Sequence, residues 1–185
     1  MEIIVCRNDT EWDGWLAANH DGRSGVWLKI AKKHSGRTTV SITEALDVAL
    51  CYGWIDSIRR SDDEDYYLQR YSPRRPNSHW SKVNVAKVES LIAAGRMRPP
   101  GLAQVEAAQA DGRWAAAYES QKNATVPADL AEALEQNSEA KSYFEQLGKT
   151  DRYQVILRLL KAKTPKNRTL LLEKTISALE AGEMP

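Results

Sequence analysis

The chain has few of the residues that build disulfide frameworks or metal clusters. It contains only two cysteines, Cys6 and Cys51, which excludes the bridged scaffold of a small secreted domain. Its three histidines, His20, His34 and His79, each lack a second histidine or a cysteine at ligand spacing. The sequence therefore predicts no transition-metal site and no resident cofactor.

Charge imbalance and long apolar runs are also lacking. Lys and Arg total 26 against 25 Asp and Glu, a net charge of +1 at pH 7, so bulk charge favours neither nucleic acid nor an anionic membrane as a partner. No apolar run approaches the roughly 20 residues that a membrane helix needs. The first residues lack the basic and apolar regions of a signal peptide. We expect a cytoplasmic protein without a membrane span.

The aromatic residues are unusual, because the chain has a single Phe but six Trp. Hydrophobic residues make up 42% and charged residues 28% of the 185 positions, which is ordinary for a globular chain that buries a core. A buried Trp usually needs a partner for its indole N–H, so Trp is common both in cores and beside pockets. We expect most of the six in the core and one or two beside a pocket.

Hydrophobic periodicity predicts strands and helices in the first two thirds of the chain. Alternation of apolar and polar residues between turn-forming residues indicates strands, and apolar residues at helical spacing indicate helices. The predicted strands are residues 25–30, 38–42, 54–60 and 66–72. The predicted helices are residues 41–52, 80–94 and 99–110. We therefore expect an α+β fold, an antiparallel sheet built from two hairpins with helices packed against it.

The last third of the sequence predicts helices only. The expected helices follow Pro127, span residues 138–147, begin at Asp151, and span residues 169–181. The weak pattern of residues 112–126 predicts a linker or a covering segment. We expect an α+β core domain over residues 1–118 and a C-terminal helical module over residues 127–185, docked on that domain.

One segment, residues 66–88, carries charge of a single sign. It holds five cations and no acid, with His79 among them. Arg74 and Arg75 precede an expected helix start, where free backbone N–H groups also favour an anion. The segment predicts a surface for an anionic small molecule or an acidic protein segment; the alternative is a solvated surface, salt-bridged to the acidic loop of residues 62–65. The candidate ligand-binding residues are Trp54, Arg70, Arg74, Arg75, Ser78 and Trp80.

Pairing of the predicted strands 54–60 and 66–72 predicts a partner for Asp56. If Arg60 faces Tyr66 across the loop, an antiparallel register sets Asp56 opposite Arg70. Such a pair either specifies the fold or supplies an acid–base group for a reaction on an anionic metabolite. Asp56 and His79 are the catalytic candidates. The sequence leaves open whether the protein is an enzyme, and it favours a binding protein.

Three other features have simpler interpretations. Cys51 ends a predicted helix, and we expect it to be buried and unreactive. The acidic residues 62–65 lack the ligand spacing of a calcium loop and predict a solvated hairpin tip. A basic C-terminal turn without interleaved aromatic residues favours a solvated surface over nucleic-acid binding, so nucleic acid is a disfavoured partner. That turn contains Lys161, Lys163, Lys166 and Arg168.

Three stretches together resemble a known family. EALDVALCYGWIDSIRR and YYLQRYSPRRPNSHWSKVNVAKVESLIAAGRMRPPG resemble the YdeI/OmpD-associated (bacteriocin-protection) family, with a likeness that covers about residues 10–115. RYQVILRLLKAKTPKNRTLLLEKTISALEAG is similar to the helical tail of that family, though more loosely. The resemblance implies a small α+β domain of the YjbR/frataxin-like superfamily. It also implies an accessory role in envelope stress and in tolerance of bacteriocins or antimicrobial peptides, with no established reaction.

Overall fold

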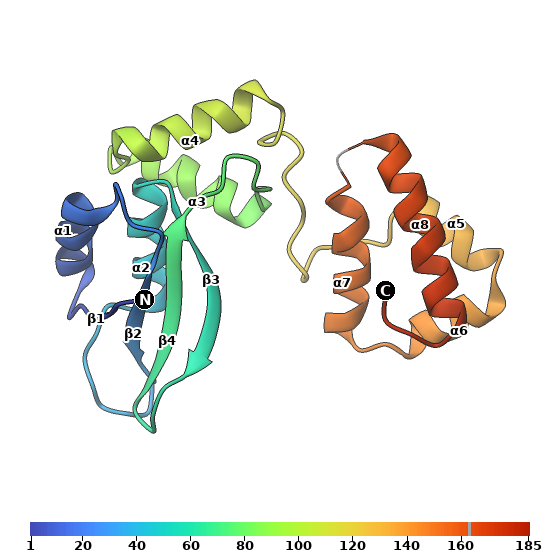
Figure 1. The fold of residues 1–185 in the computed structure, drawn as a ribbon, viewed down its shortest axis with the longest axis horizontal. Coiled ribbons are helices and arrows are strands. Elements are labelled where there is room, and N and C mark those ends of the chain that lie inside the picture. The colour runs from blue at the N-terminus through green and yellow to red at the C-terminus, as the bar shows by residue number, and fades with distance from the viewer. Residues whose placement is uncertain (163) are drawn as a thin grey trace. The chain divides into compact units, whose positions relative to one another are not determined.

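The computed structural model describes residues 1–162 and 164–185, which form two compact units (Figure 1). The N-terminal unit comprises residues 1–80 and 84–116, and the C-terminal unit comprises residues 81–83 and 117–185. The sheet lies in the first unit, and the second is built from helices. The predicted α+β class with a C-terminal helical module is therefore confirmed.

A four-stranded sheet of order β1-β2-β4-β3 forms the centre of the N-terminal unit. Its strands are β1 (Ile3–Val5), β2 (Val26–Ala31), β3 (Trp54–Ser61) and β4 (Tyr66–Pro73). The β3–β4 hairpin and the β2–β4 pair are antiparallel, whereas β1 runs parallel to β2. The sheet is thus mixed rather than purely antiparallel, because a short strand that the sequence did not predict joins its edge.

The predicted first hairpin is wrong, since residues 38–41 form no strand. The side-chain oxygen of Thr39 accepts a hydrogen bond from the backbone N–H of Ala31, and Val40 donates to the carbonyl of Cys6. The segment therefore leads from β2 into the next helix. In its place β4 pairs with all six residues of β2, which buries Val26, Leu28 and Ile30.

Four helices belong to this part of the chain, and α2 packs on β3, α1 and α4. They are α1 (Asp9–Asn19), α2 (Ile42–Cys51), α3 (Lys82–Ala93) and α4 (Pro99–Ala110). The predictions for α2, α3 and α4 agree within about two residues, whereas α1 was not predicted. Ser41 caps α2, and its reciprocal hydrogen bonds with Glu44 form a capping box.

Tryptophan dominates the core of the N-terminal unit. Trp12, Trp54 and Trp80 are each at most 2% exposed, so half of the six lie in the core, and the other three are partly exposed. Trp12 stacks on Trp15, contacts Tyr71 of β4 at 5.5 Å between ring centroids, and donates its indole N–H to the carbonyl of Ala45. These contacts fix α1 against both α2 and the sheet.

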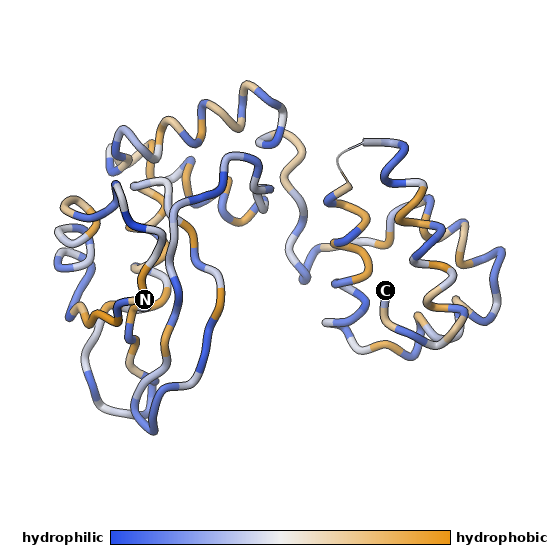
Figure 2. Tube along the Cα trace, in the orientation of Figure 1, coloured by the Kyte–Doolittle hydropathy of each residue, from blue (hydrophilic) through white to orange (hydrophobic). Residues whose placement is uncertain are grey.

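The C-terminal unit is a bundle of four helices around its own apolar core (Figure 2). Its helices are α5 (Ala128–Glu135), α6 (Ser138–Gln146), α7 (Lys149–Leu160) and α8 (Pro165–Glu180). Helix α8 begins four residues before its predicted start, because Pro165 occupies the first helical turn and Thr164 supplies the cap. Among the described helices, none is long and apolar enough to cross a membrane.

Candidate functional site

The ends of several elements meet around Gly53 in the N-terminal unit. Gly53 ends α2 with a φ of +71°, and its carbonyl accepts the backbone N–H of Arg74 at 3.0 Å. A Cβ at Gly53 would lie 2.9 Å from the carbonyl oxygen of Pro100, and one at Gly101 would lie 2.2 Å from that of Cys51. The absence of these two side chains lets α4 begin in direct contact with the end of α2.

A cleft of about 350 Å³ opens at this junction. Helix α1 supplies its C-terminal end, α2 and β3 supply the turn at Gly53, β4 supplies its last residues, and α4 supplies its first turns. Its lining residues are His20, Asp21, Tyr52, Gly53, Trp54, Pro73, Arg74, Pro100 and Gln104. The cleft therefore combines flat aromatic and proline surfaces with a few polar groups.

Arg74 is the cation of this lining that stays charged at every physiological pH. Only 5% of the Arg74 surface is exposed, and the guanidinium carbon lies 3.8 Å from the centroid of the Trp80 ring. Its Nη2 donates to the carbonyl of His79 at 2.8 Å. Trp80 and the backbone of the preceding loop thus hold the guanidinium in one place.

His20 forms the opposite end of the polar lining. Its Nδ1 lies 3.0 Å from the carbonyl of Leu16, and a ring that donates there keeps the lone pair on Nε2. Its imidazole packs on the Tyr52 ring at 5.4 Å, and its own carbonyl accepts the indole N–H of Trp54. The two aromatic walls of the cleft are therefore fixed by the end of α1.

This arrangement suits binding. Arg74 and the half-buried Gln104 can donate hydrogen bonds, the His20 ring can accept one at Nε2, and Asp21 is the single acid among the lining residues. The lining contains no Ser, Thr or Cys, so it supplies no such nucleophile for covalent catalysis. The geometry fits a small molecule that has an anionic group and a flat body.

The predicted ligand-binding residues divide between this cleft and other places. Trp54 and Arg74 line the cleft, and Trp80 lies under the guanidinium of Arg74. Arg75 is exposed on the following loop, and the buried Ser78 hydroxyl has no hydrogen-bond partner among the described residues. Arg70 pairs in register with Trp27 of β2, which places it on the opposite face of the sheet from Trp54.

The predicted pairing of Asp56 with Arg70 is wrong. Asp56 lies opposite Tyr71, because Arg60 faces Leu68 instead of Tyr66 and a bulge between Asp56 and Arg59 then shifts the register by one residue. Burial raises the pKa of the Asp56 carboxyl, although Arg59 and Arg74 act in the opposite direction. Neither Asp56 nor His79 lines the cleft, although Arg74 acts on the Asp56 carboxyl and donates to the backbone carbonyl of His79.

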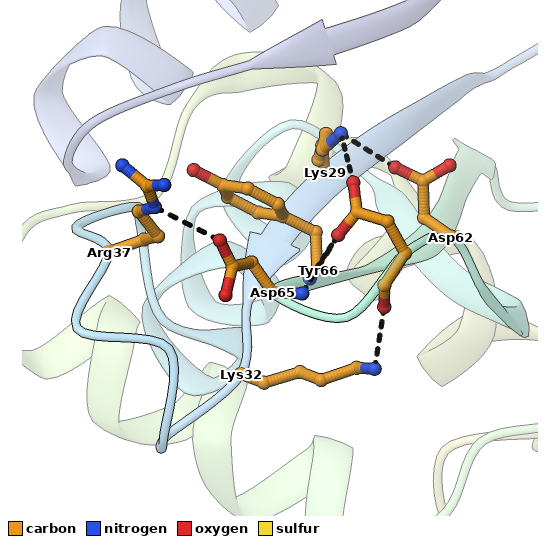
Figure 3. Close-up of polar contacts among 7 residues, drawn as sticks. Lys29, Lys32, Arg37, Asp62, Asp65 and Tyr66 are labelled. Carbon is orange, nitrogen blue, oxygen red and sulfur yellow. Dashed lines mark hydrogen bonds and ion pairs between the residues drawn. The ribbon is translucent and has the colours of Figure 1, made fainter.

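The acidic hairpin tip is held by cations of β2 and of the segment that follows it (Figure 3). The Lys29 amino group lies 2.7 Å from a carboxylate oxygen of Asp62 and 3.0 Å from one of Asp63. Arg37 pairs with Asp65 at 3.1 Å. These carboxylates have local partners, so the alternative that pairs them with the arginine segment finds no support. Within residues 1–162 and 164–185, no cluster of three or more His, Cys, Asp or Glu is placed to hold a metal ion.

Both cysteines are buried free thiols, which confirms the expected burial of Cys51. Burial raises the pKa of the Cys51 thiol and raises that of Cys6 to about 11. In the basic turn, Arg168 is occupied within the C-terminal unit, since it donates two hydrogen bonds to the carboxylate of Asp129. Lys163 of that turn lies outside the described residues.

Sequence reasoning missed several residues of the cleft, namely His20, Asp21, Pro100 and Gln104. His20 and Asp21 follow directly after α1, and the sequence does contain a signal for this helix. Asn8 precedes Glu11 by three residues, and its side chain accepts the backbone N–H of Glu11 as an N-cap. Gln104 carried no signal, because only the packing of α4 on Gly53 brings it to the cleft.

The fold defines the class of this chain as an α+β unit joined to a helical bundle. Residues 4–104, more than half of the chain, match the family described as a domain of unknown function (DUF8412), and the chain belongs to this family. Residues 123–182 match the family described as bacteriocin-protection, YdeI or OmpD-associated. No curated protein and no solved structure matches the chain.

The second match supports the resemblance to the YdeI/OmpD-associated family, and it falls on the C-terminal unit. The sequence placed the stronger likeness over residues 10–115, a stretch that largely coincides with the first family match. The C-terminal match supports an accessory function related to bacteriocin protection. Membership of the YjbR/frataxin-like superfamily stays a prediction.

Proposed function

We propose that this protein is a cytoplasmic accessory protein of bacteriocin or antimicrobial-peptide tolerance whose N-terminal unit binds a small anionic molecule in the cleft beside Trp54 and Arg74. The observation that carries the proposal is the lining of the cleft, in which Arg74, His20 and Gln104 surround flat walls of Trp54, Tyr52 and two prolines. The match of residues 123–182 supports the protective role.

The size of the cleft supports a small ligand. Its volume of about 350 Å³ lies at the lower end of the range of roughly 300–1,000 Å³ typical of small-molecule sites. The ligand class we propose is a planar carboxylate or phosphate ester, because a guanidinium binds either group through two parallel hydrogen bonds. The rings of Trp54 and Tyr52 provide the surface for its planar body.

The charges at the cleft give a test that leaves the core intact. Asp21 is exposed, so Asp21→Asn removes the one acid of the lining with little effect on the fold. We expect Asp21→Asn to strengthen binding of an anion roughly threefold, because it removes a repulsive charge in a solvated site. Gln104→Ala should weaken binding roughly fivefold through loss of one hydrogen bond.

The experiment is isothermal titration calorimetry of the full chain with benzoate, phenyl phosphate and the neutral analogue benzamide. Arg75→Ala is the matched control, because it removes an exposed arginine next to Arg74 that does not line the cleft. We expect Asp21→Asn to strengthen binding of both anions without affecting benzamide, Gln104→Ala to weaken binding of both anions, and Arg75→Ala to have no effect. If the anions bind no better than benzamide, or if Arg75→Ala weakens binding as much as Gln104→Ala, the cleft is not the site.

The protective role and the location need separate measurements. A strain without the gene should become more sensitive to bacteriocins or cationic peptides, and the wild-type gene should restore tolerance whereas Gln104→Ala should restore less. Cell fractionation tests the cytoplasmic location. Unchanged sensitivity of the deletion strain contradicts the protective role, and it leaves the binding experiment as the test of the cleft.

A further inference from the structure

A cavity of about 650 Å³ in the C-terminal unit lies beside the first turns of α7. Residues 121–126 form one wall, Phe144 of α6 forms the floor, and α7 forms the other wall. Two hydrogen bonds attach the first wall to α7: the Tyr153 hydroxyl donates to the carbonyl of Glu119, and the Gln121 amide donates to the Thr150 hydroxyl. The cavity is therefore part of the folded bundle.

Three cations and no acid line this cavity: Lys122, Lys149 and Arg152. Among the described residues, none of the three forms an ion pair. The Arg152 guanidinium donates to the carbonyls of Leu147 and Glu145, which orient it without neutralising its charge. Asp151 is the nearest acid in sequence, but it is exposed and does not line the cavity. The mouth of the cavity is thus positively charged.

The helix end adds to this field. Helix α7 begins at Lys149, and its N-cap Gly148 has no side chain to bind the free backbone N–H groups of the first turn. The positive end of the helix dipole therefore lies among the cations. An anionic group fits this end of the cavity better than a neutral one.

Most of the remaining lining is apolar, and its polar groups are the Gln121 amide and the Tyr153 hydroxyl. Phe144 and Ile156 belong to the core of the bundle and are each 5% exposed, whereas Val126 is 40% exposed. A smaller cavity of about 190 Å³ shares Val126, Phe144 and Arg152 with the first; Ala131 and Leu134 line it together with the charged residues Glu135, Lys141 and Glu145. The apolar surface offered to an alkyl chain is therefore the one that Val126, Phe144 and Ile156 provide in the larger cavity.

We infer that this cavity binds an anionic amphiphile, with a carboxylate or phosphate head at Lys122, Lys149 and Arg152 and an alkyl chain along Val126, Phe144 and Ile156. A free fatty acid and a monoalkyl phosphate share this chemistry. The site is independent of the cleft beside Trp54, because the residues of each lie within a single unit.

The test is calorimetric titration of the full chain, below the micelle threshold, with dodecanoate, dodecyl phosphate, the neutral dodecyl maltoside and inorganic phosphate. We expect both anionic amphiphiles to bind at least tenfold more tightly than the maltoside or phosphate, and the tighter of the two identifies the head group. Shortening the chain by two methylenes should weaken binding about tenfold wherever those methylenes are buried. Amide shifts of Tyr153 and Ile156 in nuclear magnetic resonance spectra locate the bound molecule.

Matched variants separate the head-group site from general charge. The double variant Lys122→Ala/Lys149→Ala should weaken anionic binding at least tenfold, while Lys166→Ala/Lys174→Ala removes two exposed lysines of α8 and should leave it unchanged. Val126→Asn should weaken binding of dodecanoate and leave circular dichroism unchanged, because Val126 is largely exposed. Equal binding of the neutral amphiphile, no binding of either anion, or equal losses in the two double variants overturns the inference.

Discussion

The guanidinium carbon of Arg74 lies 3.8 Å from the centroid of the Trp80 ring, and the same side chain donates to the carbonyl of His79. An arginine expected to contact ligand on an open surface therefore also fastens the loop after β4 to the core. The proposed binding role of Arg74 is therefore linked to stability, and each Arg74 variant needs a measurement of both ligand binding and the free energy of unfolding.

We predict that Arg74→Ala lowers the free energy of unfolding of the N-terminal unit by about 3 kcal/mol. The change removes a desolvated cation–π contact and leaves the buried Trp80 face and the His79 carbonyl without their partner. Arg75→Ala should change it by less than about 0.5 kcal/mol, because its side chain is exposed. Urea unfolding followed by Trp fluorescence measures this unit, since all six Trp lie at or before residue 114. Similar losses in both variants would contradict the role of Trp80.

Gly101→Ala tests the junction that forms the cleft. A Cβ at this position would lie 2.2 Å from the carbonyl oxygen of Cys51, so α4 must move away from α2. We expect a loss of about 2–3 kcal/mol in the same unfolding experiment and weaker binding of the anionic probes. Gly14→Ala in α1 is the control, because nothing lies within 4 Å of its Cβ position, and it should stabilise by about 0.5–1 kcal/mol. If Gly101→Ala leaves the free energy of unfolding unchanged, the contact between α4 and the end of α2 relaxes without cost.

Asp56→Asn should stabilise the protein at neutral pH and have little effect near pH 3. Burial raises the pKa of the Asp56 carboxyl above its value in the unfolded chain, so the folded state holds its proton more tightly. Stability therefore falls as the pH rises from the unfolded-state pKa to the raised folded-state pKa, and the cost persists above both. Urea midpoints at the two pH values measure the difference, with Asp21→Asn as the exposed control. A loss of stability at neutral pH would show that Arg59 and Arg74 outweigh the burial.

The ion pair between Asp129 and Arg168 predicts the opposite pH dependence in the C-terminal unit. Its hydrogen bonds to Arg168 lower the pKa of the Asp129 carboxyl, so the pair stabilises above the unfolded-state pKa and its contribution is lost as the pH falls through the lowered folded-state pKa. The gain is about 0.5 kcal/mol, since the two side chains are 36% and 30% exposed and solvent screens the pair. Amide signals of α5 and α8 in nuclear magnetic resonance spectra follow this unit, and Asp129→Asn should remove the acid-dependent loss. If the variant unfolds with the same pH dependence, the pair contributes nothing.

Local sequence signals predicted much of the fold. The Ser41 capping box, the stop at Gly53 and the alternation on either side of the acidic loop each depend on neighbouring residues, and α2 and the β3–β4 hairpin agree with the prediction. The failures have long-range causes. Residues 38–41 have strand-like composition, but β4 occupies the edge of β2 that they would need. The bulge near Asp56 cannot be read from a pattern of alternation, and a shift of one residue changes every cross-strand partner.

The sequence by itself determined that this is an α+β chain with a helical C-terminal part, that Trp would build its core, and that the charge near Arg74 is segregated. Those properties follow from composition and from periodicities of a few residues. Only the tertiary structure decided which groups meet. Trp54 and Arg74 share a cleft with His20 and Gln104, while Arg70 faces the other side of the sheet, because strand register and the close contact at Gly101 set the position of each side chain.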